Sequence, residues 1–110
     1  MKYWKLFIST CLGILSLPAY ASTSSLGKPV NLIANNAGRF FFDFTGPRDQ
    51  RPACATFNRW VIDATTDQGR ALMALMMTAK AQDKTITVYG TGDCRDWADT
   101  ESIAHFVVHD

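Results

Sequence analysis

Short segments of the chain carry the features of β-strands. In each one, hydrophobic and polar positions alternate or aromatic and β-branched residues are abundant, and both patterns predict strands with a buried face. Gly, Pro, Asn and Asp residues separate these segments, as is typical of turns and loops. The predicted strands are Val30–Ala34, Arg39–Phe44, Ala53–Ile62, Thr85–Tyr89 and Ser102–Val108.

The first two strands are predicted to form a hairpin. The segment Asn35–Gly38 between them contains residues that tolerate positive φ, which favours a tight turn. On the second strand, the phenylalanines at positions 40, 42 and 44 share one face, while Phe41 lies on the other face between Arg39 and Asp43. We therefore expect Phe41 to lie on the solvent side, where it is a candidate interface residue.

A helical pattern follows the third strand. Apolar residues recur at the spacing of one helix face, namely Leu72, Leu75, Met76 and Ala79. Thr65 fits the N-cap of this helix, and Gln68, three residues later, completes a capping box. The helix is expected to run to about Gln82.

The opposite side of this helix is less polar than a surface helix requires. Met73 and Met77 lie there, and a helix that is apolar nearly all round buries more than one face. Two explanations stay open: the second face is a subunit interface in a homo-oligomer, or the helix is sunk deeply into its own sheet. Met73 and Met77 are the candidate interface residues of the first explanation.

The order of elements is strand, strand, strand, helix, strand, strand. It predicts a mostly β domain with one α-helix, an α+β fold, and more specifically a five-stranded OB-fold-like barrel with the helix between strands three and four. A sandwich or an open α+β sheet shares this order. Residues 29–110 form the predicted domain, and Ser22–Lys28 is a polar segment expected to be a flexible lead-in.

The first 21 residues have the pattern of a secretory signal peptide. Lys2 and Lys5 precede a mostly apolar run, Leu6–Leu17, and the small residues Ala19 and Ala21 follow it. That run has 12 residues, whereas a membrane-spanning helix needs about 20. We expect cleavage after Ala21, export to the periplasm or the cell exterior, and no membrane span after cleavage.

Cleavage would remove Cys11 and leave Cys54 and Cys94. An even pair of cysteines in an oxidising compartment predicts a disulfide. A zinc site or a thiol nucleophile fits poorly, because the sequence has no Cys-x-x-Cys pair. Without its signal the chain would carry 9 basic and 10 acidic residues, which argues against nucleic acid as a partner.

Part of the sequence resembles a known family. Ala53–Trp60, the helix through Ala71–Ala79 and the strand Lys84–Tyr89 are similar to the central part of the subtilase cytotoxin B subunit family, with Cys94 as the matching second cysteine. Members of that family are secreted OB-folds that form pentameric rings and bind cell-surface glycans. The resemblance implies a ring-forming, carbohydrate-binding module. The chain is shorter, lacks a second disulfide and matches none of the glycan-contacting segments, so the resemblance assigns no binding residue.

Recognition chemistry is concentrated near the second cysteine. Trp97 lies among Arg95, Asp96 and Asp99, and an exposed indole can stack on a sugar or fill a partner pocket. We take Trp97, Arg95 and Asp99 as candidate ligand-binding residues. Tyr89 and Phe41 are weaker candidates, and Trp60 is expected in the core.

The histidines and the acidic residues do not predict a metal or cofactor. His105 and His109 lie in a predicted strand, where residues four apart are separated by about 13 Å, too far for one ion. The acidic segment from Asp93 to Glu101 does not match a calcium loop.

We therefore predict a non-enzymatic binding or assembly module that recognises a glycan or a protein. One alternative is a small periplasmic hydrolase using Asp96, Asp99 and His105. Another is a monomeric envelope or inhibitor protein.

Overall fold

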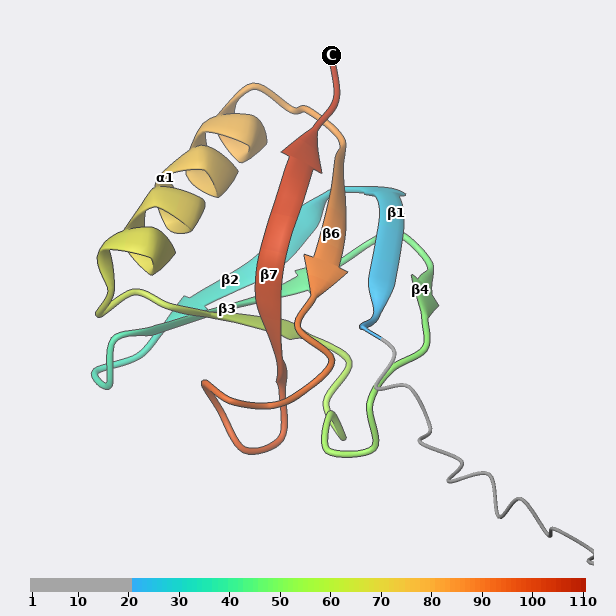
Figure 1. Cartoon of the computed structure of the whole chain (residues 1–110). Coiled ribbons are helices and arrows are strands. Elements are labelled where there is room, and N and C mark those ends of the chain that lie inside the picture. The colour runs from blue at the N-terminus through green and yellow to red at the C-terminus, as the bar shows by residue number, and fades with distance from the viewer. Residues whose placement is uncertain (1–20) are drawn as a thin grey trace, which may run out of the picture.

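The computed structural model describes residues 21–110, which form seven strands and one α-helix (Figure 1). The expected mostly β, α+β class is confirmed. The predicted signal segment lies outside the described residues except for Ala21. No helix within residues 21–110 has the length and apolar character needed to cross a membrane. The elements are β1 Thr23–Gly27, β2 Pro29–Ala34, β3 Arg39–Phe44, β4 Arg48–Asp49, β5 Trp60–Asp63, α1 Asp67–Ala81, β6 Ile86–Gly90 and β7 Glu101–Val108.

The strands form one sheet in the order β2-β3-β5-β7-β6-β1-β4. Every neighbouring pair is antiparallel except β5 and β7, which are parallel. Helix α1 connects β5 to β6 and packs against β5 and β7. Strands β1 and β2 are separated by Lys28 alone, yet β2 borders β3 and β1 borders β6. At Lys28 the chain therefore passes directly from the part of the sheet with β6 and β4 to the part with β3.

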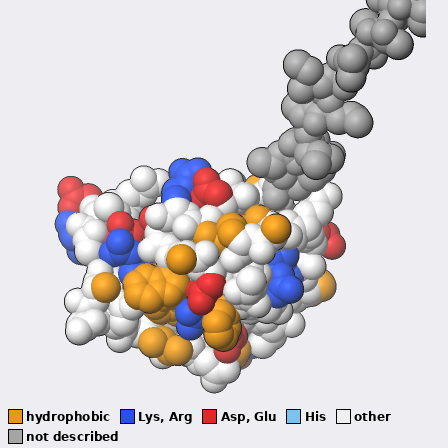
Figure 2. All heavy atoms as spheres, turned by 90° about the horizontal axis from the view of Figure 1, so that it is seen from below, with side chains coloured by type: hydrophobic (Ala, Val, Ile, Leu, Met, Phe, Trp, Pro, Cys, Tyr) orange, Lys and Arg blue, Asp and Glu red, His pale blue; other side chains and the backbone are white. Residues whose placement is uncertain are grey.

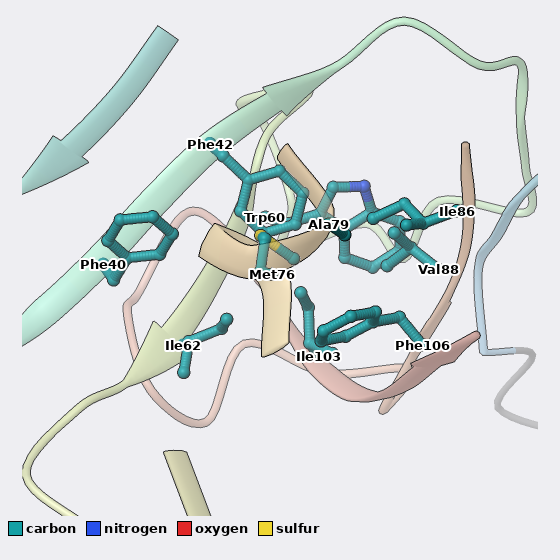
Figure 3. Packing of buried hydrophobic residues seen from close by; sticks show 10 residues of the cluster. All are labelled: Phe40, Phe42, Trp60, Ile62, Met76, Ala79, Ile86, Val88, Ile103 and Phe106. Carbon is teal, nitrogen blue, oxygen red and sulfur yellow. The ribbon is translucent and has the colours of Figure 1, made fainter. Parts of the chain in front are cut away.

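The hydrophobic core lies between the sheet and α1 (Figure 3). Trp60, Phe42 and Met76 are at most 1% exposed and fill its centre. Two of the three phenylalanines expected on one face of β3 are buried here, as the alternation predicted. The cluster consists of Phe40, Phe42, Trp60, Ile62, Met76, Ala79, Ile86, Val88, Ile103 and Phe106.

The predicted hairpin between β2 and β3 is present. The side-chain oxygen of Asn35 accepts hydrogen bonds from the backbone N–H groups of Ala37 (3.1 Å) and Arg39 (2.9 Å). Gly38 has φ 74°, and a Cβ there would lie 2.4 Å from Thr65 Cγ2. The turn therefore requires glycine for both its backbone conformation and its close packing.

The helix begins one residue later than the capping box predicted. Its N-cap is Thr66, whose hydroxyl accepts a hydrogen bond from the N–H of Gly69 at 2.9 Å. Thr65 instead donates its hydroxyl to Asp63 Oδ1 at 2.6 Å. A Cβ on Gly69 would lie 1.7 Å from the carbonyl oxygen of Asp63, so close approach of β5 fixes where the helix begins. The expected end near Gln82, the C-cap, is confirmed.

Two segments differ from the sequence prediction. Ser22–Lys28, expected to be a flexible lead-in, contains strand β1, which pairs with both β4 and β6. Of the expected strand Ala53–Ile62, only the part from Trp60 is a strand, and residues 53–59 form a loop. Both differences arise because hydrogen-bond partners come from distant segments, which local composition does not specify.

Candidate functional site

Two loops, residues 53–59 and 91–100, lie side by side at one end of the sheet (Figure 1). The predicted disulfide between Cys54 and Cys94 is confirmed and joins them, with the two Cα atoms 6.2 Å apart. The backbone N–H of Phe57 also donates to the carbonyl of Asp99 at 3.1 Å. We call the four side chains that these loops bring together the loop platform: Phe57, Arg59, Trp97 and Asp99.

Arg59 lies at the centre of the loop platform. Its guanidinium carbon is 4.3 Å from the centre of the Phe41 ring and 4.7 Å from that of Phe57. Its Nε donates to Thr100 Oγ1 at 3.0 Å, and its Nη2 lies 3.5 Å from Asp99 Oδ1. Stacking on two rings together with these polar contacts holds the guanidinium in one orientation.

Phe41 lies beneath this arginine. The expectation that Phe41 faces solvent is wrong, because it is only 3% exposed. Arg59 covers one side of the ring, and Trp97 packs against it edge-on with ring centres 5.3 Å apart. The second face of β3 is thus covered by the two loops rather than by water, and Phe41 supports the loop platform from below.

The upper side of the loop platform is open. Phe57 is 54% exposed, and the Arg59 and Asp99 side chains are 22% and 37% exposed. Figure 2 views this end of the molecule and shows hydrophobic side chains gathered around acidic and basic ones. Such a surface offers apolar ring area together with a hydrogen-bond donor and acceptor at fixed positions.

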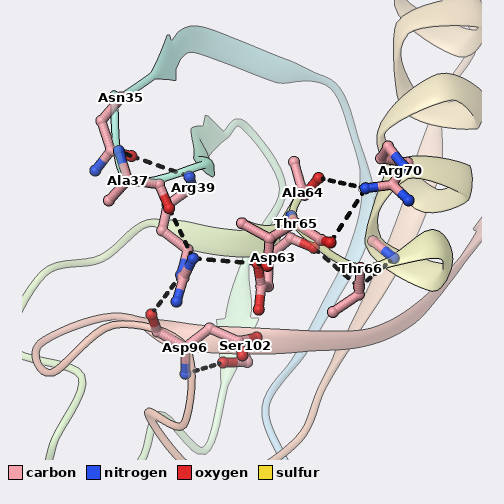
Figure 4. Close-up of polar contacts among 11 residues, drawn as sticks. Asn35, Ala37, Arg39, Asp63, Ala64, Thr65, Thr66, Arg70, Asp96 and Ser102 are labelled. Atoms are coloured by element: carbon pink, nitrogen blue, oxygen red, sulfur yellow. Dashed lines mark hydrogen bonds and ion pairs between the residues drawn. The ribbon is translucent and has the colours of Figure 1, made fainter.

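A groove of about 370 Å³ adjoins the platform between the start of α1, β7 and the Thr91–Asp96 loop. Arg39 organises its wall (Figure 4): its Nη1 donates to Asp63 Oδ1 at 3.1 Å and its Nε to the carbonyl oxygen of Asp96 at 3.0 Å. The N–H of Asp96 donates to Ser102 Oγ at 3.1 Å. Asp96 is therefore fixed by its backbone, immediately before Trp97.

Arg95 lines this groove rather than the loop platform. It donates from Nε and Nη2 to the two carboxylate oxygens of Asp93 at 2.8 and 2.7 Å. These hydrogen bonds are the largest cause that lowers the pKa of Asp93 to about 2, and Thr91 contributes another. The same pair raises the pKa of Arg95. The ion pair shapes the loop that presents Trp97.

Tyr89 occupies a different surface. Its ring stacks on that of His105, its neighbour across β6 and β7, with ring centres 4.5 Å apart and planes inclined by 16°. Tyr89 belongs to neither the loop platform nor the groove. Among the predicted ligand-binding residues, the structure thus brings Trp97 and Asp99 together above Phe41, places Arg95 at the neighbouring groove and separates Tyr89.

A second arginine and carboxylate lie inside the protein. The Arg48 and Glu101 side chains are 6% and 0% exposed, and Arg48 Nη2 donates to Glu101 Oε1 at 2.6 Å. The guanidinium lies 3.9 Å from the centre of the Trp60 ring. Burial lowers the pKa of Arg48, and Glu101 opposes that shift. Among residues 21–110, the Arg48 Nε has no hydrogen-bond partner.

The three residues of the hydrolase alternative, Asp96, Asp99 and His105, each contact different neighbours. Asp99 accepts the Thr100 hydroxyl at 2.8 Å, and His105 stacks on Tyr89. Asp96 makes its hydrogen bonds through its backbone. His109 contacts Thr87 Oγ1 at 2.8 Å. Within residues 21–110, no group of three His, Cys, Asp or Glu side chains is placed to hold a metal ion.

Sequence reasoning missed Phe57 and Arg59. Both lie in the segment predicted as a strand, where their partners on the other loop are about forty positions away. The predicted disulfide was the available signal, because it requires residues near Cys54 and Cys94 to be neighbours.

Comparison with known proteins gives no match: no family model fits the chain, and no curated protein or solved structure matches it. The similarity to the subtilase cytotoxin B subunit family therefore stays a prediction from the residues.

Proposed function

We propose that this protein is an exported, non-enzymatic recognition module that binds a glycan on the loop platform. One observation carries the proposal: the exposed Phe57 ring stacks on the partly exposed Arg59, which pairs with Asp99, and a disulfide holds the two loops together. Export is supported by the signal pattern of residues 1–21 and by the disulfide, which persists in oxidising compartments.

The chemistry of the surface suits a sugar. The apolar C–H face of a pyranose packs on aromatic rings, and its hydroxyl groups both donate and accept hydrogen bonds. Phe57 and Trp97 supply ring surface, while Arg59 donates and Asp99 accepts. Because Arg59 is already held by Phe41 and Thr100, little side-chain freedom is lost on binding.

We further propose that the sheet is an OB-type barrel. The continuous run of β1 and β2 through Lys28 supports closure, because it pairs with β6 at one end and with β3 at the other. The parallel pairing of β5 and β7, with α1 between β5 and β6, also fits this type of barrel.

Ring assembly through α1 is the second part of the proposal. No charged residue occurs from Ala71 to Ala79, and Leu75 and Met77 are 47% and 45% exposed. The sequence expectation for two residues is wrong: Met73, expected on the outer face, packs against the core, and Leu75, expected on the inner face, is exposed. A second copy of the chain is the proposed occupant of the outer face around Leu75 and Met77.

Light scattering of the unmodified protein and of a Leu75→Glu, Met77→Glu variant tests this assembly. We expect the unmodified protein to be an oligomer and the variant to be a monomer. A monomeric unmodified protein contradicts the assembly.

Glycan binding is tested by an array of immobilised glycans probed with the protein, Phe57→Ala and Trp97→Ala. We expect the variants to lose about tenfold or more of the affinity for any bound glycan, as for central aromatic contacts. Tyr89→Ala is the matched control, since Tyr89 is aromatic and lies off the loop platform. The proposal fails if the unmodified protein binds no glycan, or if Phe57→Ala binds like the unmodified protein.

A further inference from the structure

Ser22 is enclosed by the fold at the point where β1 begins. It is 0% exposed, whereas the preceding Ala21 is exposed. The Ser22 hydroxyl donates to the carbonyl of Gln50 at 2.8 Å, and the Ser22 carbonyl accepts the N–H of Gly90 at 2.8 Å. The bond between Ala21 and Ser22 therefore joins a solvated residue to a fixed one.

The nitrogen of Ser22 faces a buried carboxylate. It lies 3.2 Å from Glu101 Oε2, an oxygen that also accepts the N–H of Gly92 at 3.0 Å. The other oxygen, Oε1, accepts from Arg48. A buried carboxylate is stabilised more by a charged donor than by a neutral amide N–H. The position of the Ser22 nitrogen thus suits an ammonium group.

We propose that the peptide bond between Ala21 and Ser22 is a processing site and that the amino group released there pairs with Glu101. In the hydrolysis, water attacks the Ala21 carbonyl carbon, the C–N bond breaks, and the hydroxyl stays on Ala21 while nitrogen takes a proton. At neutral pH the products are the Ala21 carboxylate and the Ser22 ammonium. A signal peptidase is the class of enzyme required, so this inference rests on the proposed export.

The surroundings of the new terminus favour this pairing. Removal of Ala21 opens the nitrogen toward water, so the ammonium keeps part of its hydration while one side faces Glu101. The charged groups on the elements around it are Glu101 from β7 and, from β4, Arg48 and Asp49, the residue opposite Thr23; the charge of Arg51 acts on Arg48. Strand β1 follows Ser22 directly and is paired with β4 and β6, which holds the new amino group beside these strands.

The first test is to express the full chain with its signal, purify the exported protein and determine its N-terminus by mass spectrometry. We expect it to begin at Ser22; another start overturns the inference.

A matched chain with Gly-Ser inserted between Ala21 and Ser22 places an amide at the same nitrogen. We expect its Tm to be lower by about 5 °C, the size expected for one charged pair in a domain of this length. Equal Tm values overturn the ion pair.

A second measurement leaves Glu101 unchanged. NMR titration of the Ser22 amino group in the mature protein should give a pKa above the ordinary value of about 7.7, because Glu101 favours the ammonium form. The inserted chain, with its amino group two residues away, should titrate near the ordinary value. An ordinary pKa in both chains contradicts the pairing. Neither readout uses a glycan, so failure of glycan binding and failure of this inference are separable.

Discussion

Two arginines of this protein have similar partners in opposite surroundings. Arg48 stacks on Trp60 and pairs with Glu101 where the two charged side chains are 6% and 0% exposed. Arg59 stacks on two phenylalanine rings and pairs with Asp99 where they are 22% and 37% exposed. The same combination of guanidinium, ring and carboxylate is therefore sealed in one place and reachable in the other.

The difference in exposure assigns different roles. A sealed ion pair has no alternative partner in water, so loss of one member leaves an uncompensated charge. A partly exposed pair exchanges with water at little cost, and a ligand can replace that water. The buried pair thus secures the junction of β4 and β7, and the exposed pair serves recognition.

The largest effect is expected from Glu101→Gln. It leaves the Arg48 charge buried without its carboxylate, which should lower the free energy of unfolding by about 3–5 kcal/mol. Urea unfolding of the mature protein measures the change. Asp99→Asn is the matched control at the exposed pair, where we expect about 1 kcal/mol or less. Equal losses at the two sites would contradict the comparison.

Removal of the disulfide should come next. Cys54→Ser with Cys94→Ser releases a loop with a sequence separation of 40, and the chain-entropy relation gives a loss of about 3–4 kcal/mol. The loops of the platform also separate, so glycan binding should fall more than it does in Phe57→Ala. Unfolding with and without reductant, on the unmodified protein, provides the same comparison without substitution. Unchanged stability after reduction would argue that the loops are held by their other contacts.

A smaller effect is expected from Arg59→Lys. The ammonium keeps the charge but loses the planar stacking on Phe41 and Phe57, so stability should fall by about 1 kcal/mol. Thermal unfolding measures this, with Arg51→Lys, at an exposed residue, as the control. A loss as large as that of Glu101→Gln would show that the exposed arginine is also a structural element.

The smallest effect concerns Asp93. Its pKa is lowered to about 2 by Arg95, so the pair stabilises the fold above the ordinary carboxylate value, and this contribution is lost as pH falls from about 4 toward about 2. The Asp93 side chain is 48% exposed, which limits the effect to about 1 kcal/mol or less. Asp93→Asn should therefore lie below the unmodified protein in Tm near neutral pH and approach it in acid. A constant difference across this range contradicts the assignment.

Local patterns predicted β2, β3, α1, β6 and β7 because hydrophobic residues recur in each of these segments at the spacing, or with the residue types, of its secondary structure. The same patterns failed for β1, a polar segment whose hydrogen bonds come from β4 and β6. They also overextended β5, because Phe57 and its neighbours in the 53–59 loop lie beside the 91–100 loop rather than within the sheet. At the candidate site, composition identified Trp97 and Asp99, but Arg59 and Phe57 acquire their partners only through folding.

The sequence by itself determined the class of the domain, the position of its helix and the pairing of Cys54 with Cys94. These depend on residue periodicity and on the number of cysteines, which are properties of the chain alone. Only the tertiary structure decided which arginine is buried, which ring is covered and where the nitrogen of Ser22 lies. Those outcomes depend on which distant segments exclude water from a given side chain, and local sequence does not contain that information.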